Sequence, residues 1–262
     1  MLTLTTLASG SSGNCALLSD GQTHILLDAG ISARRITTGL KNLGVNPAEL
    51  AAVLVTHEHS DHVSGLATLT RQLPVMVYAS GGTARRLLAK LPALEGRMQV
   101  FQPGACFCVG GVEVETFPTP HDAAESTGYA LSAGGRKAAV VTDLGRVTAA
   151  VEAGIRGAHL LLAEANYEPE WLESGPYPPF LKARIRGERG HLSNAAGAEL
   201  ACAGAAQGAV TVVLGHLSRE NNTPRRAYDT VRAALERQGA AVGGDVALEV
   251  APRDTLSPTY LV

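Results

Sequence analysis

The stretch His57-Glu58-His59-Ser60-Asp61-His62 places three imidazoles and an aspartate within a single short turn. It follows the apolar run 51–56, which has the length and composition of a buried strand, and it precedes the apolar, helix-like segment 63–73. The cluster is therefore predicted to lie on a strand-to-helix loop. These side chains suit divalent cations such as zinc or manganese. A solvated charged turn is the alternative, but three of the chain's eight histidines lie here.

Further ligand-type residues follow other predicted strands. The alternating segment 112–117 leads to His121, the apolar run 137–142 leads to Asp143, and the run 209–214 leads to His216. Each residue taken alone is better explained as a capping or turn residue. Their repetition at strand ends favours one site at which several strands converge.

These motifs, in this order, make the sequence similar to the metallo-β-lactamase-fold hydrolase superfamily over nearly the whole chain. The resemblance implies an α/β fold, an αββα sandwich of two mixed sheets with helices on both outer faces. It also implies two divalent metal ions, Zn or Mn, able to clamp the oxygens of a displacement. The expected ligands are His57, His59 and His121 for one ion, Asp61, His62 and His216 for the second, and Asp143 as the bridge.

The first of the five matching motifs is Leu26-Leu27-Asp28-Ala29-Gly30, at the end of the opening strand pair. Asp28 is expected to orient the ligand loop through hydrogen bonds, because metal ligands generally need such partners.

Finer motifs resemble one branch of the superfamily, the YycJ/WalJ family. That family is associated with DNA exonuclease activity from the 5′ end, so the resemblance implies a phosphodiesterase. Substrate contacts are expected from the loops that carry these motifs, at Ser11, Ser12, Asn14, Ser193 and Asn221. The sequence departs from the family at Tyr167-Glu168, where a histidine and an acidic residue are common. The matching motifs are Ser9 to Asn14, His121 to Ala124, Thr142 to Gly145, Glu164 to Asn166, Gly190 to Asn194 and His216 to Asn222.

His191 lies on a turn that opens a predicted helix, which Ser193 or Asn194 could cap. Its placement is similar to that of a histidine in the tRNA 3′-processing enzymes of the superfamily, which pairs with a glutamate from the preceding strand. Glu164 occupies the matching position. His191 and Glu164 are predicted to deliver a proton to the leaving oxygen. Asp61 is predicted to be both a metal ligand and a catalytic residue. The alternative is a solvent-exposed histidine at a helix start.

A basic cluster, defined as Lys182, Arg184, Arg186 and Arg189, comes directly before Gly190-His191 and is offset only by Glu188. Guanidinium groups beside a catalytic histidine are suited to binding the phosphates that flank the scissile bond. A solvated helix face is the alternative, since charge runs usually have no other role.

The chain is predicted to form one domain over residues 1–262, in two halves that share one site, because ligand-type residues occur in both halves. The four cysteines show no disulfide framework and are expected to be packing residues. Strands are expected near 1–30, 51–56, 75–78, 97–118, 127–142, 158–164 and 209–214, and helices near 32–43, 63–72, 80–91, 146–155, 193–205 and 224–238.

The composition suits a cytoplasmic enzyme with no membrane partner, because no apolar segment reaches the length of a membrane-spanning helix. The formal net charge of −2 gives no general attraction to nucleic acid.

The function expected from these observations is a two-metal-dependent phosphodiesterase, a 5′-to-3′ exonuclease acting on DNA with an accessible 5′ end. Alternatives are an RNA-processing nuclease of the same fold, a hydrolase of small acyl substrates such as thioesters or lactones, and a metal-binding regulator without turnover. The sequence leaves the native metal and the oligomeric state open.

Overall fold

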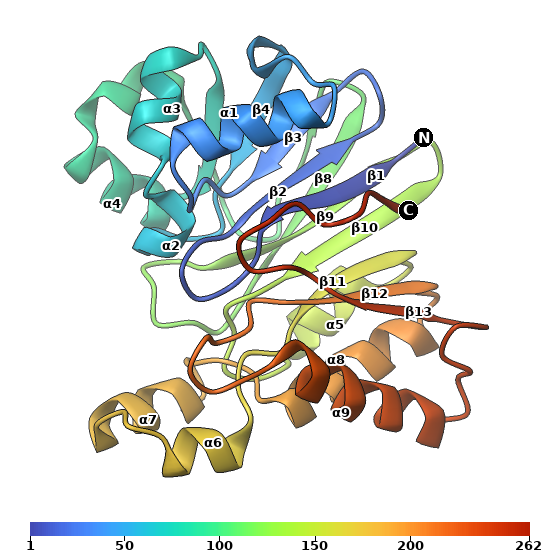
Figure 1. Ribbon diagram of the computed structural model, residues 1–262. Coiled ribbons are helices and arrows are strands. Elements are labelled where there is room, and N and C mark those ends of the chain that lie inside the picture. Colours follow the sequence, from blue (N-terminus) through green and yellow to red (C-terminus); the bar gives the residue numbers. More distant parts are fainter.

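The computed structural model describes residues 1–262 as two seven-stranded sheets packed face to face, with helices on both outer faces (Figure 1). The αββα sandwich expected from the sequence is confirmed. The first sheet has the order β14 (Tyr260–Leu261), β1 (Thr3–Ala8), β2 (Cys15–Ser19), β3 (His24–Leu27), β4 (Leu50–Leu54), β5 (Met76–Ser80), β6 (Met98–Phe101). The second has the order β13 (Ala247–Val250), β12 (Thr211–Gly215), β11 (Leu160–Glu164), β10 (Arg136–Val141), β9 (Thr127–Ala133), β8 (Val112–Pro118), β7 (Cys106–Val109).

Alternation along the strands explains the layers, because successive side chains of a strand point to opposite faces. In β4, Ala52 and Leu54 join the core between the two sheets, whereas Val53 joins the core under the outer helices. In β11, Leu160 and Leu162 face the inner core and Leu161 faces outward. Strands buried on both faces thus have sequences that are continuous apolar runs.

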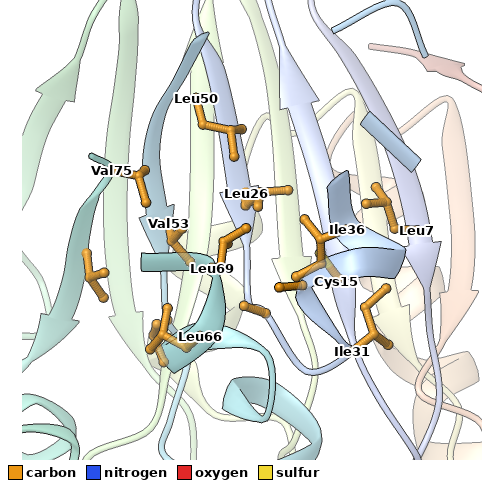
Figure 2. Packing of buried hydrophobic residues seen from close by; sticks show 14 of the residues in the cluster. Leu7, Cys15, Leu26, Ile31, Ile36, Leu50, Val53, Leu66, Leu69 and Val75 are labelled. Carbon is orange, nitrogen blue, oxygen red and sulfur yellow. The ribbon is translucent and has the colours of Figure 1, made fainter. Parts of the chain in front are cut away.

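The helices cover the outer faces with apolar stripes. Figure 2 shows Ile36, Leu66 and Leu69 packed over Leu26 and Val53 of the first sheet. The helices on that side are α1 (Ala33–Asn42), α3 (Leu66–Gln72) and α4 (Gly81–Lys90), and those on the second sheet are α5 (Ala149–Ile155), α8 (Asn194–Ala206) and α9 (Pro224–Arg237). Short elements complete the fold: η1 (Pro47–Glu49), α2 (Ser60–Val63), η2 (Pro92–Arg97), α6 (Pro169–Ser174) and α7 (Pro179–Arg186).

Strand direction places the site. Strands β3 to β6 run parallel in the first sheet, and β10 to β13 run parallel in the second. Ligand-type residues follow the carboxyl ends of strands in both sheets, so the loops that carry them meet at one edge of the sandwich.

The structure contains elements that the sequence did not predict. Helices α6 and α7 lie in a proline-rich stretch with little hydrophobic periodicity, and α7 buries no residue completely. The short strands β13 and β14 extend the two sheets, and β14 pairs with β1, so that the ends of the chain lie close together (Figure 1). No helix has the length and apolarity needed to cross a membrane.

The cysteine prediction was wrong for two residues. Cys15 and Cys202 are buried, but Cys106 and Cys108 are exposed. Their strand, β7, is the edge of the second sheet, and alternation turns both thiols outward while Phe107 packs against the inner core.

Candidate active site

The ligand loop 57–62 follows β4, includes the start of the one-turn helix α2, and packs closely on the loop after β3. His57 and His62 are completely buried, and His59 is partly exposed. The backbone N–H of Ala29 donates to the carbonyl of His62 at 2.8 Å. At Gly30, a Cβ atom would lie 1.7 Å from the carbonyl oxygen of Asp61, so only glycine permits this contact. The position of the histidine cluster is therefore fixed by backbone packing.

Three residues that follow strands have left-handed backbone conformations, which non-glycine residues seldom adopt. They are Asp28 after β3, Asp143 after β10 and His216 after β12, with φ of 61°, 58° and 55°. Aspartate and histidine tolerate this region better than bulkier residues do, and such strain is typical of functional sites.

The structure brings together all seven residues predicted as metal ligands. One group whose donor atoms lie within 4.8 Å of one another contains His57, His59 and His121, and another contains Asp61, His62 and His216. Asp143 lies between the groups. Its carboxylate oxygens are 3.1 Å from His62 Nε2 and 3.6 Å from the Nε2 atoms of His121 and His216.

The donor set fits divalent cations. The Nε2 atom of His57 is buried and has no hydrogen-bond partner in the chain. An orphaned imidazole nitrogen inside a protein is costly unless something binds it. Imidazole and carboxylate donors grouped at this spacing are the ligands that zinc and manganese prefer.

Carboxylates shape the electrostatics of the cluster. Burial and the neighbouring His62 hold the pKa of His57 well below its usual value. Burial also opposes the charged form of His62, but Asp143 and Asp28 outweigh it and raise the pKa of His62 well above its usual range. In the same way, carboxylates led by Asp143 overcome burial and raise the pKa of His216 to about 10. Protons and metal ions would thus compete for these two rings.

Asp28 makes the contacts expected of a supporting residue. Its Oδ2 lies 2.7 Å from His62 Nδ1, and its Oδ1 accepts a hydrogen bond from the backbone N–H of Thr56 at 2.8 Å. This contact leaves His62 Nε2 directed at the site, where it lies 3.1 Å from Asn14 Nδ2. A similar contact orients His121, whose Nδ1 donates to the carbonyl of Gly190 at 3.0 Å.

Glu164 serves two histidines, which the sequence did not indicate. Its Oε1 lies 2.8 Å from the Nδ1 atoms of both His191 and His216, and its Oε2 accepts from the backbone N–H groups of Leu144 and Leu192 at 3.1 and 3.2 Å. These contacts occupy both of its oxygens, although Glu164 and His191 also group with Asp143 and His216 at metal-ligand spacing. We therefore interpret Glu164 as a carboxylate that orients both rings.

The basic cluster is divided by the structure. Arg184 pairs with Asp122 at the rim of the site, and Arg186 pairs with Glu173 at 2.9 Å on the surface. Lys182 Nζ donates to the carbonyl of Glu173. Arg189 donates from Nε and Nη2 to the carbonyl of His121 at 2.9 and 2.7 Å, so its guanidinium secures the loop of a candidate ligand.

Of the other residues predicted to contact substrate, one lines the cavity and the rest do not. Ser11 and Ser12 are both exposed, and only Ser11 lines the cavity beside the candidate metal ligands, which we call the active cavity. Asn14 is buried and braces its own loop by accepting from the backbone N–H of Gly10 at 3.0 Å. Ser193 caps α8 by accepting a hydrogen bond from Ala196 N, and the buried Asn221 donates its backbone N–H to Ser218 Oγ at 3.1 Å. Neither residue lines the cavity.

The active cavity has a volume of about 390 Å³ and contains residues that the sequence analysis missed. The most informative are Tyr177, Leu181 and Ile185, whose spacing of four residues was a usable signal. Tyr167, where the family commonly has histidine, is buried outside the cavity, and it bridges to Ser193 through its backbone. The other missed residues that line the cavity are Ser60, Asp122, Asn166, Gly190 and Ser218.

The chain is similar to known proteins over most of its length. Residues 23–217 match the Beta-lactamase superfamily domain. The chain is 34% identical to the exodeoxyribonuclease YycJ of Bacillus anthracis, over 97% of this chain and 96% of that protein. The chain belongs to the YycJ/WalJ family of the metallo-β-lactamase superfamily. A second member of that family, the exodeoxyribonuclease WalJ of Streptococcus pneumoniae, is 34% identical over 96% of this chain and 95% of its own length.

The fold of this YycJ/WalJ family member is shared by a solved structure. The Zn²⁺-bound PqqB of Methylobacterium extorquens superposes with a TM-score of 0.72, covering 97% of this chain and 99% of that chain at 21% identity. At this level of identity the likeness describes the fold alone. The resemblance stated from the sequence motifs is confirmed at the level of both superfamily and family.

Proposed function

We propose that the protein is a two-metal-dependent phosphodiesterase that degrades DNA from an accessible 5′ end. The observation that carries the proposal is the meeting of seven metal-type donors with the His191–Glu164 pair around one cavity, which His191 and five of the seven donors line. Support comes from relatives over nearly the full chain that are exodeoxyribonucleases. The proposed place of action is the cytoplasm.

In this proposal His57, His59 and His121 would hold one metal ion, Asp61, His62 and His216 would hold the second, and Asp143, which lies between the two groups, would be available to either. Zinc and manganese both suit this donor set. The ions would supply positive charge beside the phosphate and lower the pKa of water at the site.

The chain's own residues handle the departing sugar oxygen. Glu164 accepts a hydrogen bond at His191 Nδ1, and His191 Nε2 makes no hydrogen bond within the chain. The imidazole side chain is 21% exposed, so it can reach a substrate in the cavity. A carboxylate-backed imidazole in this position can hold a proton at Nε2 and give it to the leaving group. The hydroxyls of Ser11 and Ser218, which line the same cavity, are available to the non-bridging phosphate oxygens.

End-labelled digestion tests the proposed function. Purified protein with Mn²⁺ or Zn²⁺ would be incubated with DNA and RNA of matched sequence. Each substrate would be single-stranded or double-stranded and labelled at its 5′ or 3′ end. We expect a 5′ label to appear at once in the smallest product and a 3′ label to remain in long fragments. RNA cleavage at an equal or higher rate would favour the RNA-processing alternative. Turnover of thioesters or lactones with no nucleic acid cleaved would favour the acyl hydrolase.

The basic cluster gives a second test on the same DNA. Reversing Arg184 and Arg186 to glutamate should weaken DNA binding and lower the slope of log affinity against log salt by about 0.7 for each single-strand phosphate that is no longer neutralised. Activity on bis-p-nitrophenyl phosphate should fall less than activity on DNA, because that substrate has no flanking phosphates. The matched control reverses Arg232 and Arg237, two exposed residues of α9. An unchanged salt slope would show that these arginines do not contact phosphates and are solvent-exposed charges on the helix surface.

A further inference from the structure

One wall of the active cavity is apolar and comes from a single stretch of chain. Tyr177, Leu181 and Ile185 are the three apolar side chains that line the cavity, and we call them the apolar wall. Leu181 and Ile185 lie one turn apart on α7, and Tyr177 extends the same spacing just before that helix. All three are half-buried. They are therefore accessible to a molecule in the cavity.

The remaining lining of the cavity is polar and charged. It includes five of the seven candidate metal ligands and Arg184, which belongs to α7 and pairs with Asp122 at the rim. The cavity thus has one face suited to a phosphate group and one face suited to a flat apolar group. A nucleotide combines both chemical features in one molecule.

The size of the cavity limits how much of a strand can enter. Its volume of about 390 Å³ lies near the lower end of the range of roughly 300–1,000 Å³ for small-molecule sites. That volume suits one nucleotide rather than a base pair. A base that enters it must therefore leave its complementary strand first, at a cost of unstacking and unpairing.

We infer that the apolar wall receives the base of the 5′-terminal nucleotide, with the ring of Tyr177 as its stacking partner. The inference rests on the proposed DNA exonuclease function and adds the group that holds the substrate's terminal unit. Stacking on an aromatic ring tolerates every base, because each base has a π face. The wall therefore selects unpaired ends without selecting sequence.

A kinetic comparison with an abasic substrate tests the contact directly. Two single-stranded oligonucleotides would differ only in having a normal or an abasic residue at the 5′ end. Tyr177→Ala should lower kcat/KM on the normal strand by roughly 5- to 150-fold, the range expected for loss of one base–aromatic stack. On the abasic strand it should cause no further loss, because the group that Tyr177 contacts is already missing.

Two variants control this measurement. Tyr177→Phe keeps the ring and should retain the preference for a normal base. Phe180→Ala removes an aromatic side chain of α7 that is 75% exposed and does not line the cavity, and it should also retain the preference. An equal loss on both strands in Tyr177→Ala would overturn the inference while leaving the exonuclease function intact.

A binding measurement separates this inference from the proposed function. Strands carrying 2-aminopurine at the 5′ end would be added to His191→Ala protein, in which turnover is suppressed. Stacking should quench the fluorescence of the base. The double variant that carries both His191→Ala and Tyr177→Ala should show no quenching. Cleavage of DNA without quenching contradicts the inference alone. Failure of the wild-type protein to cleave or bind any DNA contradicts the proposed function, and the inference falls with it.

Discussion

The His191→Ala variant should keep its metal ions and lose about 10²–10⁴-fold in kcat on DNA. The imidazole is held by Glu164 at 2.8 Å and is proposed to protonate the departing sugar oxygen. The loss should shrink sharply on bis-p-nitrophenyl phosphate, because p-nitrophenolate departs without a proton. Steady-state kinetics on both substrates and elemental analysis of the variant give the comparison. His24→Ala is the matched control. His24 is the first residue of β3, whereas Asp28 follows the last residue of that strand, so His24 lies at the end of β3 that is far from the site.

Two results would reject the proton-donor role of His191. One is an equal loss of activity on both substrates, and the other is loss of metal from the variant. The related variant Glu164→Gln needs a different expectation, because Glu164 also contacts His216 at 2.8 Å. It should disturb both proton delivery and metal retention, so a clean separation of the two roles rests on His191.

Freshly purified protein should carry close to two metal ions per chain, and removing them with a chelator should abolish phosphodiesterase activity. The two donor groups lie on either side of Asp143, and together they offer more ligands than the four that one zinc normally takes. His62→Ala should lower the content to about one ion, because it removes a donor from one group and leaves His57, His59 and His121 intact. Elemental analysis after reconstitution gives the count.

A stoichiometry that stays at one ion per chain with excess metal would contradict the dinuclear prediction. Activity that returns when Mn²⁺ or Zn²⁺ is added to the chelated protein is the necessary control, because it distinguishes metal removal from unfolding. Circular dichroism of His62→Ala serves the same purpose for the variant.

The strands and a shared site at their ends could be predicted from patterns of short range, whereas the αββα sandwich and the assignment of the ligands came from the resemblance to the superfamily. A Val/Leu-rich run such as 51–56 identifies a buried strand, and the ligand-type residue after it identifies a strand end. The left-handed conformations of Asp28, Asp143 and His216 carry no such signal, because aspartate and histidine at strand ends commonly serve as turn residues.

The rest of the site depends on contacts between segments far apart in the sequence. In the sequence, Arg189 looks like one more cation of a charge run. In the structure, its guanidinium donates hydrogen bonds to the carbonyl of His121. Glu164 reads as the partner of one histidine, and only the fold brings His216 to the same oxygen. Tyr177 lies among prolines, which weaken the sequence signal for the helix that follows it. Its place in the cavity is therefore seen only in the tertiary structure.

The distribution of the candidate ligands along the chain has a consequence for biosynthesis. The loop 57–62 leaves the ribosome well before His216, which follows β12 in the second sheet, and β14 joins β1 later still. Domains fold as synthesis proceeds, from the N-terminus onward. A nascent chain therefore displays the first histidines long before it has a complete reaction centre, and the cell is not exposed to a competent nuclease until the second sheet has been made.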